Sequence, residues 1–178
     1  MTLAAGPFAI AATLLLVGGL AKAWRPTDTA HALRGLGAPI PRLAVRLAGL
    51  VEAAIGLWAL ALGDRTSAIL VALSYLAFSV FVVVALARHA PIASCGCFGR
   101  LDTPPSTLHV ILDLGALLAA VAVAFEPGVG LSRVLRDQPL AGGPFLLLVI
   151  TGTFVAFVAM TLLPRVIAVA TRADVGSA

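Results

Sequence analysis

Five long apolar runs restrict how this chain can fold. The hydrocarbon core of a bilayer is about 30 Å thick, and a helix needs about 20 mainly apolar residues to cross it. Runs of this length occur at residues 3–21, 44–62, 68–87, 107–125 and 144–163, and the first, third and fifth contain no charged residue. Backbone polar groups inside lipid must be satisfied within the protein, which only helices or closed barrels achieve. The sequence therefore predicts an all-α fold, a polytopic membrane helical bundle.

The composition agrees with a membrane protein. Of the 178 residues, 61% are hydrophobic and 11% are charged, whereas ordinary soluble domains have about 25% charged residues. The net charge of +4 is a small excess that loops beside lipid headgroups explain, so we expect a lipid bilayer and no nucleic acid as partner. The first run has no basic residue before it, which favours a retained helix over a cleavable signal peptide. We expect one domain, residues 1–164, and a short flexible tail, residues 165–178.

The segments between the runs differ in character. Residues 22–42 are basic and rich in proline and glycine, with a short interfacial helix expected around residues 28–36. Residues 63–67 predict a tight turn that makes an antiparallel helical hairpin. Three prolines frame residues 88–106 as a non-helical loop, and residues 126–143 are also expected to be loop.

Both cysteines of the chain, Cys95 and Cys97, stand in the stretch "SCGCFGR" with Gly96 between them. A disulfide needs Cα atoms about 4.4 to 6.8 Å apart, which a bent chain with a central glycine can provide. Such a bridge closes almost no loop and adds little stability, whereas strained disulfides are readily reduced. The pair therefore predicts thiol–disulfide exchange.

Two other interpretations of the cysteines stay open. The pair could bind a soft metal ion such as Cu(I), with His89 or His109 as a third ligand. That ligand set is thin, so we predict no metal site. The cysteines could also be small residues without chemistry in a non-catalytic subunit of a membrane complex.

Alternating crossings of five helices bring several ionisable residues to one membrane face. The end of the first run, the start of the second, the cysteine loop and the start of the fourth share that face. It collects Lys22, Arg25, Arg46, Glu52, Cys95, Cys97, His109 and Asp113. An ionisable group within a span costs roughly 2.5 to 3.5 kcal/mol, so such groups are expected to face the bundle interior. Lys22 could reach Glu52, either as a clamp between helices or in a proton-handling role.

His109 and Asp113 are four residues apart and share one helix face. Ser106 or Thr107 is the expected N-cap of this helix. A helix N-terminus and a nearby protonated histidine both lower the pKa of a thiol, and an Asp beside a His is a proton-relay pair. The catalytic candidates are therefore Cys95, Cys97, His109 and Asp113, with Lys22 and Glu52 as further polar candidates. A self-satisfied His–Asp pair at the headgroup boundary is the alternative.

Close helix packing is expected where small residues cluster. Gly18 and Gly19 in the first run and Gly49 and Gly56 in the second would let neighbouring backbones approach.

The stretch "SCGCFGR", between a charge-free helix and a helix with an early Asp, resembles the signature of the methylamine utilisation MauE family, which belongs with the DoxX-like membrane proteins. "GGLAKAWRP" (residues 18–26) and "LVEAAIGLWAL" (residues 50–60) resemble the family's Gly-x-x-Lys and Glu-x-x-x-Gly patterns. The similarity spans roughly residues 6–125. It implies a DoxX-like four-helix core, to which this chain adds a fifth transmembrane helix.

The resemblance also implies a function. Family members handle redox equivalents for thiols outside the cytoplasm, in the plasma membrane of bacteria, with a thioredoxin-like partner. In methylamine-using bacteria they assist maturation of the disulfide-rich small subunit of methylamine dehydrogenase, so that subunit or another disulfide-containing protein is the expected substrate. Membrane thiol oxidoreductases that use quinones carry a second cysteine pair, which this chain lacks. No cofactor is therefore firmly implied, and a quinone is the one left open. A membrane carrier of a soft metal or a thiol compound is the alternative function.

The distribution of basic residues predicts one orientation of the protein in the membrane, and the family resemblance predicts the opposite one. Nine Lys and Arg residues lie on the cysteine face and three on the opposite face, which by the positive-inside rule places the cysteines at the cytoplasmic side. The family role expects them outside. The orientation and the direction of electron flow stay open.

Overall fold

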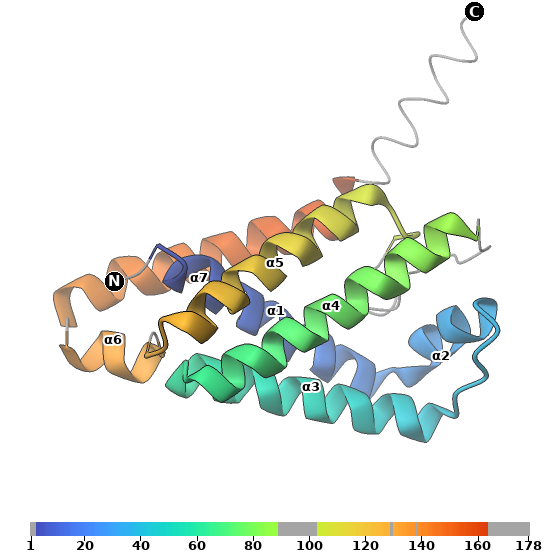
Figure 1. Ribbon diagram of the computed structural model, residues 1–178, viewed down its shortest axis with the longest axis horizontal. Helices are drawn as coiled ribbons and strands as arrows, with labels where there is room; N and C mark the ends of the chain where they lie inside the picture. The colour runs from blue at the N-terminus through green and yellow to red at the C-terminus, as the bar shows by residue number, and fades with distance from the viewer. Residues whose placement is uncertain (1–2, 89–102, 129, 138, 164–178) are drawn as a thin grey trace, which may run out of the picture.

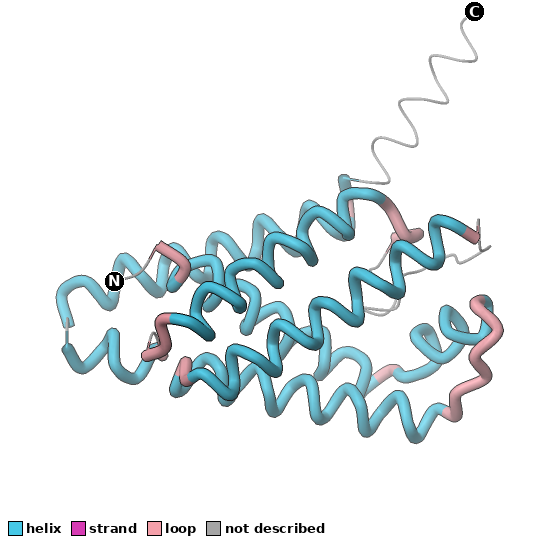
Figure 2. The backbone as a smooth tube through the Cα atoms, in the orientation of Figure 1, coloured by secondary structure: helices cyan, strands magenta, loops and turns pink. Residues whose placement is uncertain are grey.

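The computed structural model describes residues 3–88, 103–128, 130–137 and 139–163. Within these ranges the chain forms seven helices and no strand (Figures 1 and 2). They are α1 (Ala5–Trp24), α2 (Pro26–Gly35), α3 (Arg42–Leu62), α4 (Arg65–Ala87), α5 (Thr107–Phe125), α6 (Leu131–Asp137) and α7 (Pro139–Thr161). Helices α1, α3, α4, α5 and residues 142–161 of α7 are long and apolar enough to cross a membrane. The predicted all-α bundle with five transmembrane helices is confirmed.

Helix α1 is the central helix of the bundle. Of its apolar window, 61% is buried within the protein, against 33% or less in each of the other four spans. It packs most extensively against α3, and also contacts α7 and α5. Polar groups carried by α1 are therefore held inside the protein and away from lipid.

A stripe of small residues on α3 allows the close approach to α1. A Cβ atom at Gly49 would lie 2.7 Å from the carbonyl oxygen of Gly19, and one at Gly56 would lie 2.7 Å from that of Ala12. Both distances are shorter than real Cβ contacts, so the two backbones touch there without side chains between them. The predicted packing role is confirmed for Gly19, Gly49 and Gly56.

The turn between α3 and α4 joins two antiparallel helices, as predicted. Helix α3 ends at Leu62, the following Gly63 has a left-handed φ of 55°, and α4 begins at Arg65 after two intervening residues. Asp64 caps α4, its carboxylate accepting a hydrogen bond from the backbone N–H of Ser67 at 3.4 Å. Helix α4 then runs beside α5 over much of its length.

The predicted short helix after the first span is confirmed as α2. Its Ala32 packs with Ala85 of α4, and the side chain of Arg88 donates a hydrogen bond to the carbonyl of Leu36 at 3.2 Å. Helix α2 therefore lies against the end of α4 (Figure 1). This end of the bundle holds the site described below.

The loop prediction for residues 126–143 is wrong. The segment contains α6 and the start of α7. The hydroxyl of Ser132 donates to the carbonyl of Ala61 at 2.5 Å, and the N–H of Gly128 donates to the carbonyl of Gly63 at 2.8 Å. These bonds tie the segment to the end of α3. Glycine and proline in the segment indicated a loop, but Pro139 starts α7 and Pro144 lies inside it, as membrane helices tolerate.

Two predicted segments lie outside the described residues. They are the cysteine loop, of which residues 89–102 are not described, and the tail, residues 165–178. The single-domain boundary at residue 164 stays a prediction.

Candidate functional site

A small cavity of about 30 Å³ lies inside the bundle, between α1, α3, α4, α5 and α7. Its lining includes Lys22 from α1, Glu52 from α3, and His109 and Asp113 from α5. Most of its lining surface is apolar, and its volume is enough for one water molecule beside these polar groups. The structure thus brings together four of the six site residues indicated by the sequence.

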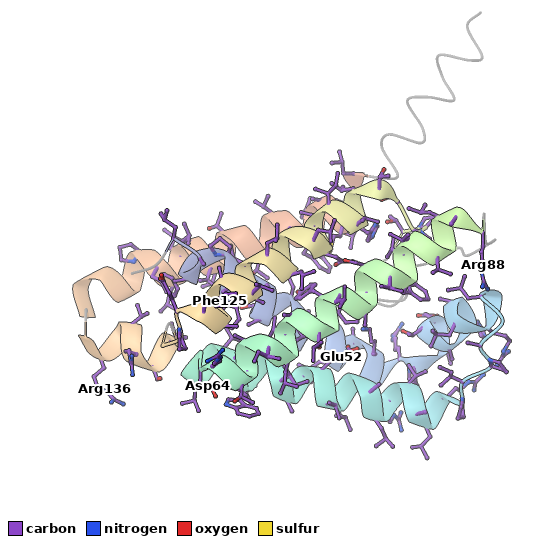
Figure 3. All side chains as sticks on the ribbon, in the orientation of Figure 1. Glu52, Asp64, Arg88, Phe125 and Arg136 are labelled. Carbon is purple, nitrogen blue, oxygen red and sulfur yellow. The ribbon has the colours of Figure 1, made fainter. Side chains whose placement is uncertain are left out.

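Lys22 and Glu52 form an ion pair across the α1–α3 contact. The Nζ atom of Lys22 lies 2.7 Å from Oε2 of Glu52, and Lys22 is only 7% exposed. Glu52 is labelled in Figure 3. The ammonium group also lies 4.1 Å from the centroid of the Phe78 ring on α4. A carboxylate and an aromatic face together compensate a cation that would be costly in a membrane helix. The expected reach of Lys22 to Glu52 is confirmed.

Gly49 and Gly56 of α3, here called the glycine stripe, determine the position of this ion pair. A Cβ atom at Gly49 would lie 2.9 Å from Cβ of Lys22, so a larger residue at position 49 would displace the lysine stem. Three residues further along α3, Glu52 then faces the ammonium group. One turn of α3 in the other direction, the Nε of Arg46 donates to the carbonyl of Ala23 at 3.0 Å and fixes the end of α1.

His109 is buried at the N-terminal end of α5. It is 2% exposed, and its Nδ1 atom lies 2.8 Å from the hydroxyl oxygen of Ser106. Ser106 occupies the predicted N-cap position, but its hydroxyl pairs with the histidine ring and not with a backbone N–H of α5. Asp113, 5% exposed, follows one turn later on the same buried face of α5. The hydroxyl of Ser106, which precedes the helix, thus contacts one ring nitrogen of His109.

Aromatic side chains of α4 complete the cavity wall. The hydroxyl of Tyr75 donates to the carbonyl of Ala11 on α1 at 2.8 Å, and its ring meets that of Phe78 edge-to-face at 5.7 Å. Both residues line the cavity, and the sequence reasoning missed them. A signal was present, because Tyr75 is the chain's single tyrosine and lies in a charge-free span where its hydroxyl needs a buried partner.

Thr103 anchors the segment that leads into α5. It is fully buried, and its hydroxyl donates to the carbonyl of Met160 on α7 at 2.9 Å. Met160 also lines the cavity. Cys95 and Cys97 lie outside the described residues, in the stretch that joins the end of α4 to Thr103.

The remaining residues expected at this face lie apart from the cavity. Arg25 and Arg46 are exposed at the surface. Within the part of the chain that the structure describes, no group of three or more His, Cys, Asp or Glu residues is placed to hold a metal ion. His89, a third ligand considered for a metal, is outside that part.

The family model for methylamine utilisation protein MauE matches residues 1–126. The chain belongs to the MauE family. The matched range runs from α1 to the end of α5, and so contains Lys22, Glu52, His109, Asp113 and both cysteines. Helices α6 and α7 follow the matched range. No similar protein was found among the curated proteins, and no solved structure matches. The protein is therefore a multi-pass membrane protein of the MauE family.

Proposed function

We propose that this MauE protein is a thiol–disulfide redox protein of the bacterial plasma membrane. Cys95 and Cys97 exchange electrons with a thioredoxin-like partner. In one direction, the two thiols reduce a partner disulfide to two thiols and themselves become a disulfide. Two electrons and two protons pass between the proteins, and the same exchange runs in reverse when the partner is the reductant.

The observation that carries the proposal is the convergence of Lys22, Glu52, His109 and Asp113 on one buried cavity. Each exchange needs a thiolate as nucleophile, and so a group that accepts the thiol proton. His109 lies six residues after Thr103, where the cysteine-bearing segment returns to the bundle. In this proposal His109 accepts the thiol proton, and Asp113 stabilises the protonated ring.

Lys22 and Glu52 supply a second donor and acceptor on the other wall of the cavity. A water molecule in the cavity would connect the two pairs, since the space suffices for one. The four residues would then keep the total charge inside the membrane constant while protons move between them.

The substrate follows from the family. We propose that the disulfide-rich small subunit of methylamine dehydrogenase, or another disulfide-containing protein, receives its disulfides with the help of this exchange. The thioredoxin-like partner would carry electrons between that substrate and the membrane protein.

Trapping of mixed disulfides tests the proposal. In cells, Cys95→Ser and Cys97→Ser each leave one thiol, and one of the two variants should accumulate a reductant-sensitive adduct with a thioredoxin-like protein. The double variant Cys95→Ser/Cys97→Ser is the control and should give no adduct. Thiols that stay fully reduced with no adduct in either variant would contradict the proposal. The purified protein could instead bind Cu(I), lose that binding in Cys95→Ser and form no adduct. This result would indicate a metal carrier.

A further inference from the structure

A second concavity lies on the other side of the Lys22–Glu52 pair. It encloses about 380 Å³ between α2, α3, α4 and the end of α1. We call it the lateral groove; its walls include Val45, Ala48, Ala77 and Phe81, and its polar end is formed by Lys22 and Glu52. Phe78, Lys22 and Glu52 line both the groove and the inner cavity. The ion pair and the ring therefore separate the two spaces.

The lateral groove is reached from the lipid. Ala48 and Ala77 are exposed, and near Ala48 α3 exposes Leu47, Leu50 and Val51 by about half of their surface. Large apolar side chains exposed on a membrane span face acyl chains. Ligand sites usually enclose 300 to 1,000 Å³ and combine apolar walls with a few converging polar groups, which matches this groove. Its ligand would be a molecule dissolved in the bilayer.

The polar end of the groove selects among such molecules. The Lys22–Glu52 pair has no net charge, so a phospholipid phosphate would lack an uncompensated positive partner there. A neutral head group fits better, because an ammonium group has three N–H donors and a carboxylate only accepts. A ring carbonyl can accept from Lys22, and a ring hydroxyl can donate to Glu52. One site thus suits both redox forms of the same ring, the carbonyl form and the hydroxyl form.

We propose that the lateral groove binds a lipid-soluble quinone with its ring at Lys22 and Glu52. This inference rests on the proposed function, since the quinone would be the electron acceptor for the cysteine pair. Two thiols and one quinone give one disulfide and one hydroquinone. Both electrons move from sulfur to the quinone, and both thiol protons end on its two oxygens. The apolar walls then hold the quinone's tail.

Quinone binding is measured directly, without any thiol readout. The full chain in nanodiscs of phosphatidylethanolamine and phosphatidylglycerol is incubated with tritiated decylubiquinone, and retention on empty nanodiscs is subtracted. Saturable binding is expected, and unlabelled decylubiquinone should compete about tenfold or more better than decylbenzene, which lacks the ring oxygens. Absence of saturable binding, or equal competition by decylbenzene, would overturn the inference. So would a co-purifying phospholipid, seen by native mass spectrometry, that decylubiquinone does not displace.

Matched variants locate the binding. Ala48→Leu/Ala77→Leu fills the groove and should weaken retention by about tenfold or more, whereas Ala54→Leu, at an exposed alanine of α3 outside the groove, should change it by less than about twofold. Equal binding by both variants would place the quinone elsewhere. Cys95→Ser/Cys97→Ser should bind as the native chain does. Quinone binding without any mixed disulfide would support the groove as a quinone site and refute the redox function. Mixed-disulfide adducts without quinone binding would support the redox function and refute the groove as a quinone site.

Discussion

At the scale of single residues, the buried Lys22–Glu52 pair is costly to disturb. Removing one partner leaves an uncompensated charge within a membrane span. Such a loss costs about 3 to 5 kcal/mol when a pair is buried. Lys22 also contacts the Phe78 ring, which gives the cation a second partner. Loss of Lys22 would leave the Glu52 carboxylate without its ion-pair partner.

Lys22→Met and Glu52→Gln are each expected to lower the melting temperature of the purified protein clearly, whereas Lys22→Met/Glu52→Gln should recover more than half of the loss. The double variant removes both charges, so neither is left buried alone. Thermal unfolding in detergent measures the effect, with Arg34→Met, at an exposed arginine of α2, as control. Additive losses in the double variant would contradict a coupled pair.

Ser106 is a positioning residue for His109, and its neighbour Thr107 provides the control. Ser106→Ala removes the hydroxyl that lies 2.8 Å from Nδ1 of His109 and should slow reoxidation of the cysteine pair by about tenfold, the equivalent of one hydrogen bond. Thr107→Ala removes an exposed hydroxyl and should have no effect. The rate is followed by alkylation after a reductant pulse. Ser106→Thr, which keeps a hydroxyl, should restore the rate, and a failure to do so would argue against this role.

At the scale of helices, the contact between α1 and α3 decides whether the site forms. Gly56 lies on the glycine stripe two turns beyond Gly49, and Gly56→Ala would push a methyl group against the backbone of α1 at Ala12 and Leu16. Overpacking of this kind typically costs about 1 to 3 kcal/mol. Gly115 on α5 is the matched control, since a Cβ atom there meets nothing within 4 Å.

Gly56→Ala should therefore lower the melting temperature, while Gly115→Ala should leave it unchanged or raise it slightly, because alanine loses less backbone entropy in a helix. Thermal unfolding of both variants in the same detergent provides the comparison. A stable Gly56→Ala protein would show that α1 and α3 can separate without loss of the fold.

The same elements show what could be predicted from the sequence. Each transmembrane helix was recognisable because an apolar run of about 20 residues has one stable outcome in lipid. Helix α6 was missed because glycine and proline around it indicate a loop when hydrogen bonds to other segments, such as that from Ser132 to Ala61, are unknown. Alternating crossings predicted that Lys22, Glu52, His109 and Asp113 lie at the same membrane face. Phe78 could not be assigned to the cavity, because a uniformly apolar helix does not reveal which face is buried, whereas the hydroxyl of Tyr75 was a signal for burial that was not used.

At the scale of the whole molecule, the two ends of the bundle are chemically different. Figure 3 places Arg88 and Arg136 at opposite ends. The end at Arg88 carries α2 and the chain leading to the cysteines, while the other end carries α6. The inner cavity and the lateral groove share Lys22 in the last turn of α1, so the proposed redox chemistry and the proposed lipid access both belong to the α2 end. Which side of the membrane that end faces decides which partners can reach it.

Labelling of introduced cysteines fixes the orientation. In Cys95→Ser/Cys97→Ser, we expect His31→Cys on α2 and Arg136→Cys on α6 to react with a membrane-impermeant maleimide from opposite sides, because both positions are exposed and lie at opposite ends. In the native chain, Cys95 and Cys97 should react from the same side as His31→Cys. Labelling of the α2 end from outside the cell would favour supply of disulfides to exported proteins. Labelling only after permeabilisation would mean that the pair receives electrons from a cytoplasmic reductant. Reaction of both introduced cysteines from one side would contradict the five-span topology itself, since an odd number of crossings separates α2 from α6.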